Sequence, residues 1–179
     1  VMILGFLFVS VLVFSEKSEG IMRSIRISPS GVFPYVLSKT VVFTILSTVY
    51  GLLLVLFTIG TASNFIALTV LLLLSCGFMT LLGLGIASFF RSISDWFVPG
   101  VIALSINMMA LIPYQLSGSF SPLFSILPGY TVIFGIHEIL FHSGNAPLFM
   151  KTTAILLAEF AVCLLFAWWS VKRNSVKEK

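Results

Sequence analysis

The sequence predicts an all-α membrane protein, a polytopic bundle of helices that cross the bilayer. Of its 179 residues, 59% are hydrophobic and only 9% are charged, whereas globular chains carry about 25% charged residues. The mean hydropathy is +1.14. A soluble domain of this size could not bury so much apolar surface, so the bilayer must be its solvent. Long uninterrupted apolar runs favour helices over the alternating strands of a barrel.

Five segments are apolar enough to belong to membrane helices, of which a full crossing takes about 20 residues. They are 1–14, 40–60, 65–90, 96–112 and 152–171. The first segment is interpreted as the end of a helix, because it starts inside an apolar run without an initiator methionine. We therefore expect one membrane domain that is truncated at its N-terminus.

The basic residues predict which side of the membrane each connection occupies. Segments 15–39 and 91–95 and the C-terminal tail hold nine of the ten Lys and Arg residues, whereas segment 113–151 holds only Lys151 and segment 61–64 has none. The positive-inside rule places the side that holds these nine basic residues in the cytoplasm. Five crossings that end in the cytoplasm begin outside. We therefore expect one more helix ahead of this sequence, which gives six, and a cytoplasmic C-terminus.

Segment 15–32 is the largest predicted cytoplasmic loop, and its periodicity predicts a short amphipathic helix that ends at Ser28-Pro29. Apolar residues share one side of this helix, and basic residues point elsewhere. The apolar residues are Ile21, Met22 and Ile25, and the basic residues are Arg23 and Arg26. Two interpretations stay open: a helix that rests among lipid headgroups, or a helix that docks on a soluble partner.

Segment 113–151 is long for a plain loop and is still very apolar. It predicts two short extracellular helices that dip back into the outer leaflet, broken at Pro122 and at Pro128-Gly129. Non-helical backbone at membrane depth is tolerated only where protein or a cavity covers it, so this re-entrant hairpin would cap the outer end of the bundle. Its aromatic residues would form either an apolar lining or an interfacial belt. They are Phe120, Phe124, Tyr130 and Phe134.

Several single residues have simple structural interpretations. Gly83 and Gly85, together with Gly77, are expected to let helices approach closely. Lys39 is interpreted as an anchor whose ammonium extends to the inner interface. No metal site is predicted, because His137 and His142 are five residues apart and not four as in the zinc motif H-E-x-x-H.

Two groups of residues carry a resemblance to a known family. The first group is Glu16-x-x-Glu19-Gly20, then Ile25, Ser28-Pro29 and Leu37-Ser38-Lys39. The second group is Leu116-Ser117-Gly118, then Pro122 and Leu127-Pro128. Their order within the predicted topology resembles the permeases of type-2 ABC exporters. In that family such runs lie in the loop after the second membrane helix and in the re-entrant segment before the last one. The resemblance covers essentially the whole chain.

The resemblance implies a permease subunit of an ATP-driven exporter in a bacterial or archaeal plasma membrane. Two such subunits, identical or related, would pair with two cytoplasmic ATPases. The amphipathic loop helix would be the coupling helix that sits in a groove of the ATPase. Its residues would be Glu16, Glu19, Gly20, Ile21, Met22, Arg23, Ile25, Arg26, Ser28 and Pro29.

The resemblance also implies a chain that is not itself an enzyme. It would hold no catalytic residue and no cofactor, because ATP and Mg²⁺ would be bound by the ATPase, and this chain has no P-loop. Its partners would be the ATPase, the second permease and the lipid bilayer, and not nucleic acid. The substrate would be hydrophobic or amphipathic: a drug-like compound, a lipid or a glycan. Residues of its path would be Glu159, Leu116, Ser117, Gly118, Pro122 and Pro128.

Glu159 lies inside the last predicted span, where an acid is costly unless it faces protein or water. It would form a structural hydrogen bond to a neighbouring helix or recognise a cationic substrate. Two other functions stay open for the chain as a whole. One is a non-transporting membrane assembly protein whose loop binds lipid. The other is an ion-driven transporter, although such proteins usually keep several ionisable groups at the midplane.

Overall fold

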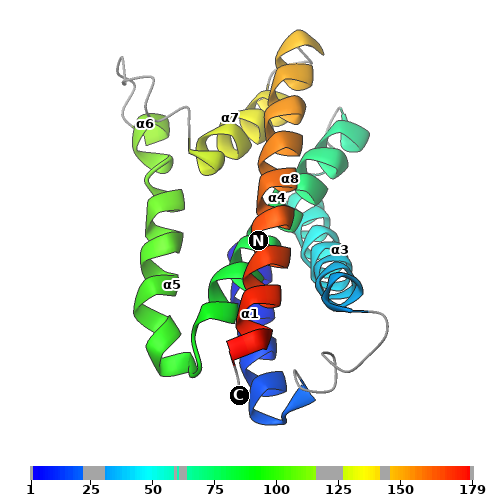
Figure 1. Cartoon of the computed structure of the whole chain (residues 1–179). Helices are drawn as coiled ribbons and strands as arrows, with labels where there is room; N and C mark the ends of the chain where they lie inside the picture. The colour runs from blue at the N-terminus through cyan, green and yellow to red at the C-terminus, as the bar shows by residue number, and fades with distance from the viewer. Residues whose placement is uncertain are drawn as a thin grey trace.

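The computed structural model describes residues 2–21, 31–58, 60, 64–115, 127–141 and 146–177, and all regular secondary structure in these ranges is helical. In chain order the helices are α1 (Met2–Ser18), α3 (Val32–Thr58), α4 (Phe65–Phe89), α5 (Ile93–Met108), α6 (Leu111–Gln115), α7 (Pro128–Phe141) and α8 (Ala146–Lys177). Figure 1 shows the long helices as a bundle, with α7 lying across it near the first turns of α8. The predicted all-α fold is confirmed.

Four stretches of the described residues are long and apolar enough to cross a membrane. They are Val32–Thr58, Phe65–Phe89, Ile93–Pro113 and Phe149–Asn174. Each overlaps a segment for which the sequence predicts a membrane helix. The remaining predicted segment, 1–14, corresponds to α1.

Three helices extend beyond the predicted spans. α1 continues to Ser18, so the expected loop 15–32 starts within this helix, and α3 and α8 begin at Val32 and Ala146, ahead of their expected starts. Hydropathy marks only the apolar part of a helix, whereas polar turns beyond it stay helical when their groups are partnered. Pro34 is compatible with α3, because the first helical turn needs no backbone N–H donor there.

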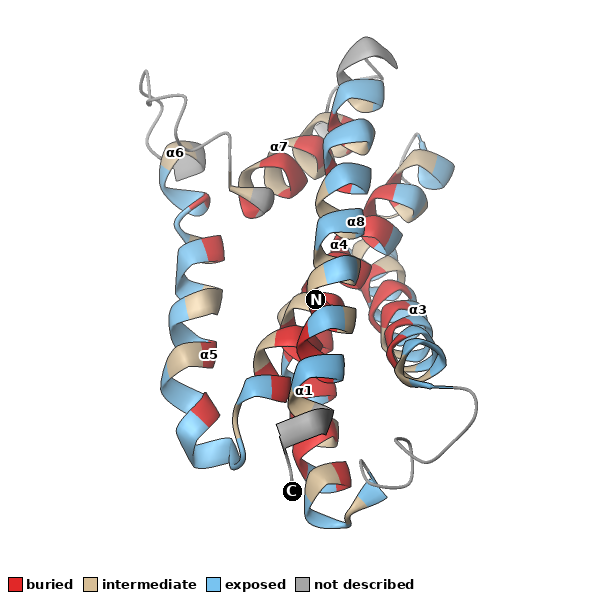
Figure 2. Cartoon of the chain, in the orientation of Figure 1, coloured by how far each residue is buried: buried red, intermediate tan, exposed pale blue. Residues whose placement is uncertain are grey.

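α4 is the central helix of the bundle. It packs against α8, α1 and α3, and it also contacts α7 and α5. Of its membrane-crossing stretch 61% is buried, compared with 22% to 28% for the three other stretches. Figure 2 shows the corresponding exposed outer faces of α5 and α8. α4 therefore determines how the other helices are arranged.

Glycines on α4 allow the close approach that the sequence predicts. A Cβ atom on Gly83 would lie 2.6 Å from the carbonyl oxygen of Phe6 on α1. A Cβ on Gly77 would lie 2.6 Å from the Phe160 ring, and one on Gly85 would lie 2.7 Å from the Phe166 ring, both on α8. The prediction of close packing at these glycines is confirmed.

α3 turns small and hydroxyl-bearing residues toward its neighbours. Its buried residues are Val36, Thr40, Thr44, Ser47, Thr48 and Gly51. Large apolar residues such as Val42 and Leu46 are 60% and 59% exposed. In water this arrangement would be unfavourable. In a bilayer it is expected, because lipid covers the apolar side while small residues let helix backbones approach.

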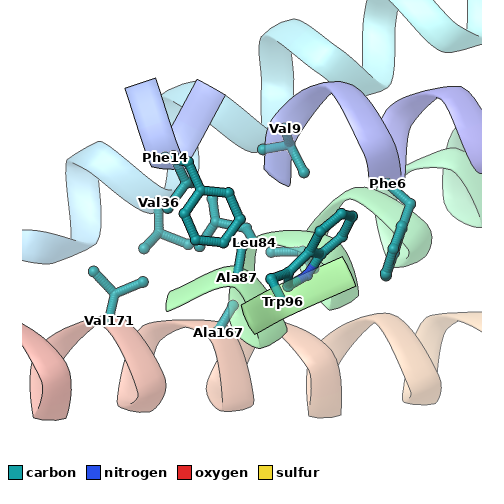
Figure 3. Close-up of a cluster of buried hydrophobic side chains, with 11 residues drawn as sticks. Phe6, Val9, Phe14, Val36, Leu84, Ala87, Trp96, Ala167 and Val171 are labelled. Atoms are coloured by element: carbon teal, nitrogen blue, oxygen red, sulfur yellow. The ribbon is translucent and has the colours of Figure 1, made fainter. Parts of the chain in front are cut away.

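Two apolar clusters hold the helices together. The first joins α1, α3, α4, α5 and α8, and Figure 3 shows Phe6, Phe14 and Trp96 within it. The Trp96 ring lies 5.8 Å from the Phe6 ring and 5.9 Å from the Phe14 ring, measured between centroids. The second cluster joins α4, α7 and α8, where Val132 and Ile139 of α7 are buried. α7 is therefore packed onto the bundle along its length.

Replacement of Gly83 by valine should destabilise the bundle. The new side chain would meet the Phe6 backbone, which cannot rotate away, so α1 must move off α4. We expect the free energy of unfolding to fall by about 2 kcal/mol, measured as a lower melting temperature in detergent. The control Ala158→Val, at an exposed position on α8, should change it little. An unchanged melting temperature for Gly83→Val would contradict the close contact.

Candidate functional site

The charged residues of α1 and those in the last turns of α8 lie at one end of the bundle. α1, α4 and α8 all finish there, and α3 and α5 begin there, at the bottom of Figure 1. We call this the basic end, because it carries Lys17, Lys39, Arg91, Lys172 and Arg173. The opposite end carries α7 and the first turns of α8.

Glu16 joins α1 to α3 at the basic end. It is only 8% exposed. Its Oε1 forms an ion pair with the Lys39 ammonium, and its Oε2 accepts a hydrogen bond of 2.5 Å from the Tyr35 hydroxyl. Both carboxylate oxygens are therefore partnered within the chain, which is what burial of a charge requires. Glu16, which the resemblance assigns to the coupling helix, points toward α3.

Lys17, the next residue, joins α1 to the end of α4. Its ammonium donates to the carbonyl oxygens of Ala87 at 3.1 Å, Ser88 at 2.9 Å and Phe90 at 2.6 Å. The last carbonyls of a helix have no partner within the helix and carry partial negative charge, so a cation is stabilised there. The sequence does not predict this contact. The only sign of this contact in the sequence is a lysine near the end of an apolar helix.

The chain then reverses from α4 into α5 through a capped turn. The Ser92 hydroxyl accepts a hydrogen bond of 3.2 Å from the Asp95 backbone N–H and donates one of 2.8 Å to the Asp95 carboxylate. This reciprocal arrangement caps the first turn of α5. Trp96, one residue later, packs on Phe6 and Phe14 of α1. The start of α5 is therefore attached to α1 as well as to α4.

α8 is attached to α4 at the same end. The Ser170 hydroxyl donates to the Gly85 carbonyl at 2.8 Å and also contacts the Ser88 hydroxyl. One turn away, Lys172 lies 5.0 Å from the centre of the Trp168 ring, and the Arg173 guanidinium lies 5.1 Å from that of Trp169. Tryptophan and basic residues in this combination are typical of a membrane–water interface.

In the sequence, the predicted coupling segment runs from the end of α1 to the start of α3, the two helices that Glu16 joins. Glu19 accepts a hydrogen bond of 3.3 Å from the Ser15 hydroxyl. Gly20 follows with φ of 74°, a left-handed conformation that ends α1, and Ile21 is 37% exposed. The described chain resumes at Gly31. Six predicted coupling residues lie outside the described residues: Met22, Arg23, Ile25, Arg26, Ser28 and Pro29.

The predicted path residues are only partly described. Pro128 is the first residue of α7. Glu159 is half-buried on α8, and its Oε2 is buried without a hydrogen-bond partner among the described residues. Leu116, Ser117, Gly118 and Pro122 lie outside the described residues. Glu159 and Pro128 are therefore the two members of this set with a defined position.

In the part of the chain that the structure describes, no three His, Cys, Asp or Glu residues are grouped so that they could hold a metal ion. His137 lies on α7, and His142 is outside the described part of the chain.

The sequence matches the model of the family described as "ABC-2 family transporter protein" over residues 1–169. The chain belongs to the ABC-2 transporter family. With four stretches that can cross a membrane, this ABC-2 protein is a multi-pass membrane protein.

Among curated proteins, this ABC-2 chain is similar to two proteins named "Fluoroquinolones export permease protein", from Mycobacterium tuberculosis strains CDC 1551 / Oshkosh and H37Rv. Identity is 29% over 106 residues in each case, which is 59% of this chain and 45% of the relative. The matched region thus spans less than half the length of these relatives. No solved structure matches the chain.

Loss of either partner of the Glu16–Lys39 pair should destabilise the protein. The remaining charge would stay partly buried without its counterion, so Glu16→Gln and Lys39→Met should each cost about 2 to 3 kcal/mol. The double variant should cost less than the sum, with an interaction energy of about 1 kcal/mol or more. Thermal unfolding of the unmodified protein, the two single variants and the double variant measures these losses of stability.

Lys172→Met, at an exposed position of the same end, provides the control and should have a small effect. Strictly additive losses for Glu16→Gln and Lys39→Met would contradict a direct pair.

Proposed function

We propose that this chain is the membrane permease part of an ATP-driven ABC exporter and works with a separate ATPase. Membership in the ABC-2 family and the likeness to two export permeases support this proposal. The observation that carries it is the contact of Glu16 with Lys39 and Tyr35. This contact clamps together the two helices on either side of the predicted coupling segment.

The basic end faces the cytoplasm in this proposal, and the C-terminus lies there. Nine of the ten Lys and Arg residues belong to segments assigned to this end, and only Lys151 lies at the other. The ATPase, which would bind ATP and Mg²⁺ and carry out hydrolysis, approaches from this side. This chain itself contributes no catalytic group and no cofactor.

The coupling segment transmits the movement of the ATPase to the bundle. Ile21, Met22 and Ile25 form its apolar contact, and Arg23 and Arg26 form its charged rim. Glu16 fastens the segment instead of contacting the ATPase. A displacement of the segment would then reach α1 and α3 through Glu16 and Lys39.

The same displacement would reach α4 and α5 through Lys17, which holds the carbonyls where α4 ends. Rigid-body movement of these helices would switch the bundle between inward-open and outward-open states.

The translocation path would form between two permease subunits, identical or related, in the plasma membrane. Segment 113–151 would be the extracellular re-entrant hairpin that covers its outer end, and Glu159 would face the path. The substrate would be amphipathic and drug-like. The names of the two relatives suggest a compound of the fluoroquinolone class.

Replacement of both Ile21 and Ile25 by aspartate should uncouple ATP hydrolysis from transport. Two carboxylates would be desolvated in an apolar groove, which is strongly unfavourable. We expect the loss of most transport, with ATP hydrolysis no longer stimulated by substrate, or release of the ATPase on purification. The intact permease co-expressed with its ATPase and reconstituted in vesicles allows both measurements.

The matched control places two aspartates in the uncharged segment 61–64, which the sequence predicts on the other side of the membrane, as Thr61→Asp with Ser63→Asp. This control should keep transport. Full coupled transport by the Ile21 and Ile25 variant would show that the segment only rests on lipid.

A further inference from the structure

A cavity of about 240 Å³ lies between α7 and α8, at the end of the bundle opposite the basic end. Its walls are made of aromatic, hydroxyl-bearing and charged residues from the two helices. They are Tyr130, Thr131, Phe134, Gly135, His137, Glu138, Lys151, Thr152 and Ile155. The volume is somewhat below the usual range of about 300 to 1,000 Å³ for small-molecule sites. It suits a polar head group better than an entire lipid.

Packing of α7 on its neighbours fixes the shape of this cavity. A Cβ on Gly135 would lie 2.8 Å from the Thr152 side chain of α8 and 2.9 Å from the Leu71 side chain of α4. At the start of α7, a Cβ on Gly129 would lie 2.4 Å from the Asn107 carbonyl oxygen of α5. α7 is thus held at two glycines, and the cavity is a built feature of the fold.

One wall of the cavity is aromatic. Tyr130 and Phe134 are four residues apart on α7, so they lie on the same face of the helix. Their ring centroids are 4.2 Å apart, with 31° between the ring planes. Stacked rings of this kind offer apolar surface to a ligand, and the face of an aromatic ring also attracts a cation.

The cavity carries opposite charges on its two helices. Glu138 comes from α7 and Lys151 from α8, and the imidazole of His137 and the hydroxyls of Thr131 and Thr152 complete the polar lining. An anion-binding or a cation-binding site would concentrate one sign of charge. One acid and one base in a small, partly aromatic cavity match a ligand that itself carries both signs.

We propose that this cavity binds the zwitterionic part of an amphiphile. The ammonium of the ligand lies against Glu138 and the face of the aromatic pair, and its phosphate or carboxylate lies against Lys151 and the hydroxyl of Thr152. Two sources share this chemistry: the head group of a zwitterionic phospholipid at the membrane surface, and a dissolved zwitterionic compound. Binding of lipid is independent of transport, whereas the dissolved source rests on the proposed export function.

The test uses the intact permease in lipid nanodiscs, with phosphatidylethanolamine and ciprofloxacin as the zwitterionic probes and phosphatidylglycerol as the anionic one. Native mass spectrometry measures retained lipid, and fluorescence titration measures ciprofloxacin. Glu138→Gln and Lys151→Gln should each weaken zwitterion binding about tenfold, since each removes one charge-assisted contact. Lys151→Arg keeps the charge and should keep binding, which separates loss of charge from a folding defect. Lys172→Gln, at the basic end, is the control.

Selective loss of phosphatidylethanolamine in both neutralising variants supports the lipid source, and selective loss of ciprofloxacin supports the dissolved source. The proposal would be overturned if Glu138→Gln and Lys151→Gln left the binding of both zwitterionic probes unchanged. Preference for phosphatidylglycerol with no effect of Glu138→Gln would overturn it as well. Neither outcome depends on whether the coupling segment drives transport, so failure here and failure of the proposed function can be told apart.

Discussion

The close approach of α1 to α4 at Gly83 determines where the charged end of α1 lies. The absence of a side chain there lets the Phe6 backbone touch α4, and the Ser10 hydroxyl reaches the Gly83 carbonyl at 3.3 Å. With the two helices in this register, Lys17 reaches the last carbonyls of α4, and Glu16 beside it faces α3. The junction of three helices at the basic end therefore follows from one glycine contact deeper in the bundle.

The bilayer explains why the helices are joined in this way. Lipid tails are as apolar as leucine, so large apolar side chains gain little by turning inward, and close contacts between small residues hold helices together. α3 illustrates this, with hydroxyl-bearing residues inside and Val42 and Leu46 outside. The ion pair of Glu16 with Lys39 and the contacts of Lys17 lie at the basic end, where water and head groups lower the cost of charge. The contacts inside the bundle and the contacts at the basic end thus rest on different interactions.

The sequence predicts the helical class, the limits of α4 and the role of its glycines, because apolar runs and small residues are local features. It does not predict the partners of Glu16 and Lys39. These membrane helices carry apolar side chains around most of their circumference. The spacing of apolar residues along the sequence therefore does not reveal which face of each helix is turned toward its neighbours. The sequence alone therefore indicates an interfacial anchor for Lys39 and a partner-facing position for Glu16, whereas the packing of α1 on α3 pairs the two side chains. The cavity lined by Glu138 and Lys151 was missed because residues from separate helices form it.

A cryo-electron microscopy structure of the intact permease bound to its ATPase would test most directly whether Glu16 and Lys17 fasten the coupling segment to the bundle. We expect the Glu16 carboxylate still to contact Lys39 and Tyr35, Lys17 still to hold the end of α4, and the residues after Gly20 to contact the ATPase. A structure in which Glu16 leaves α3 and pairs with a basic residue of the ATPase would contradict this expectation.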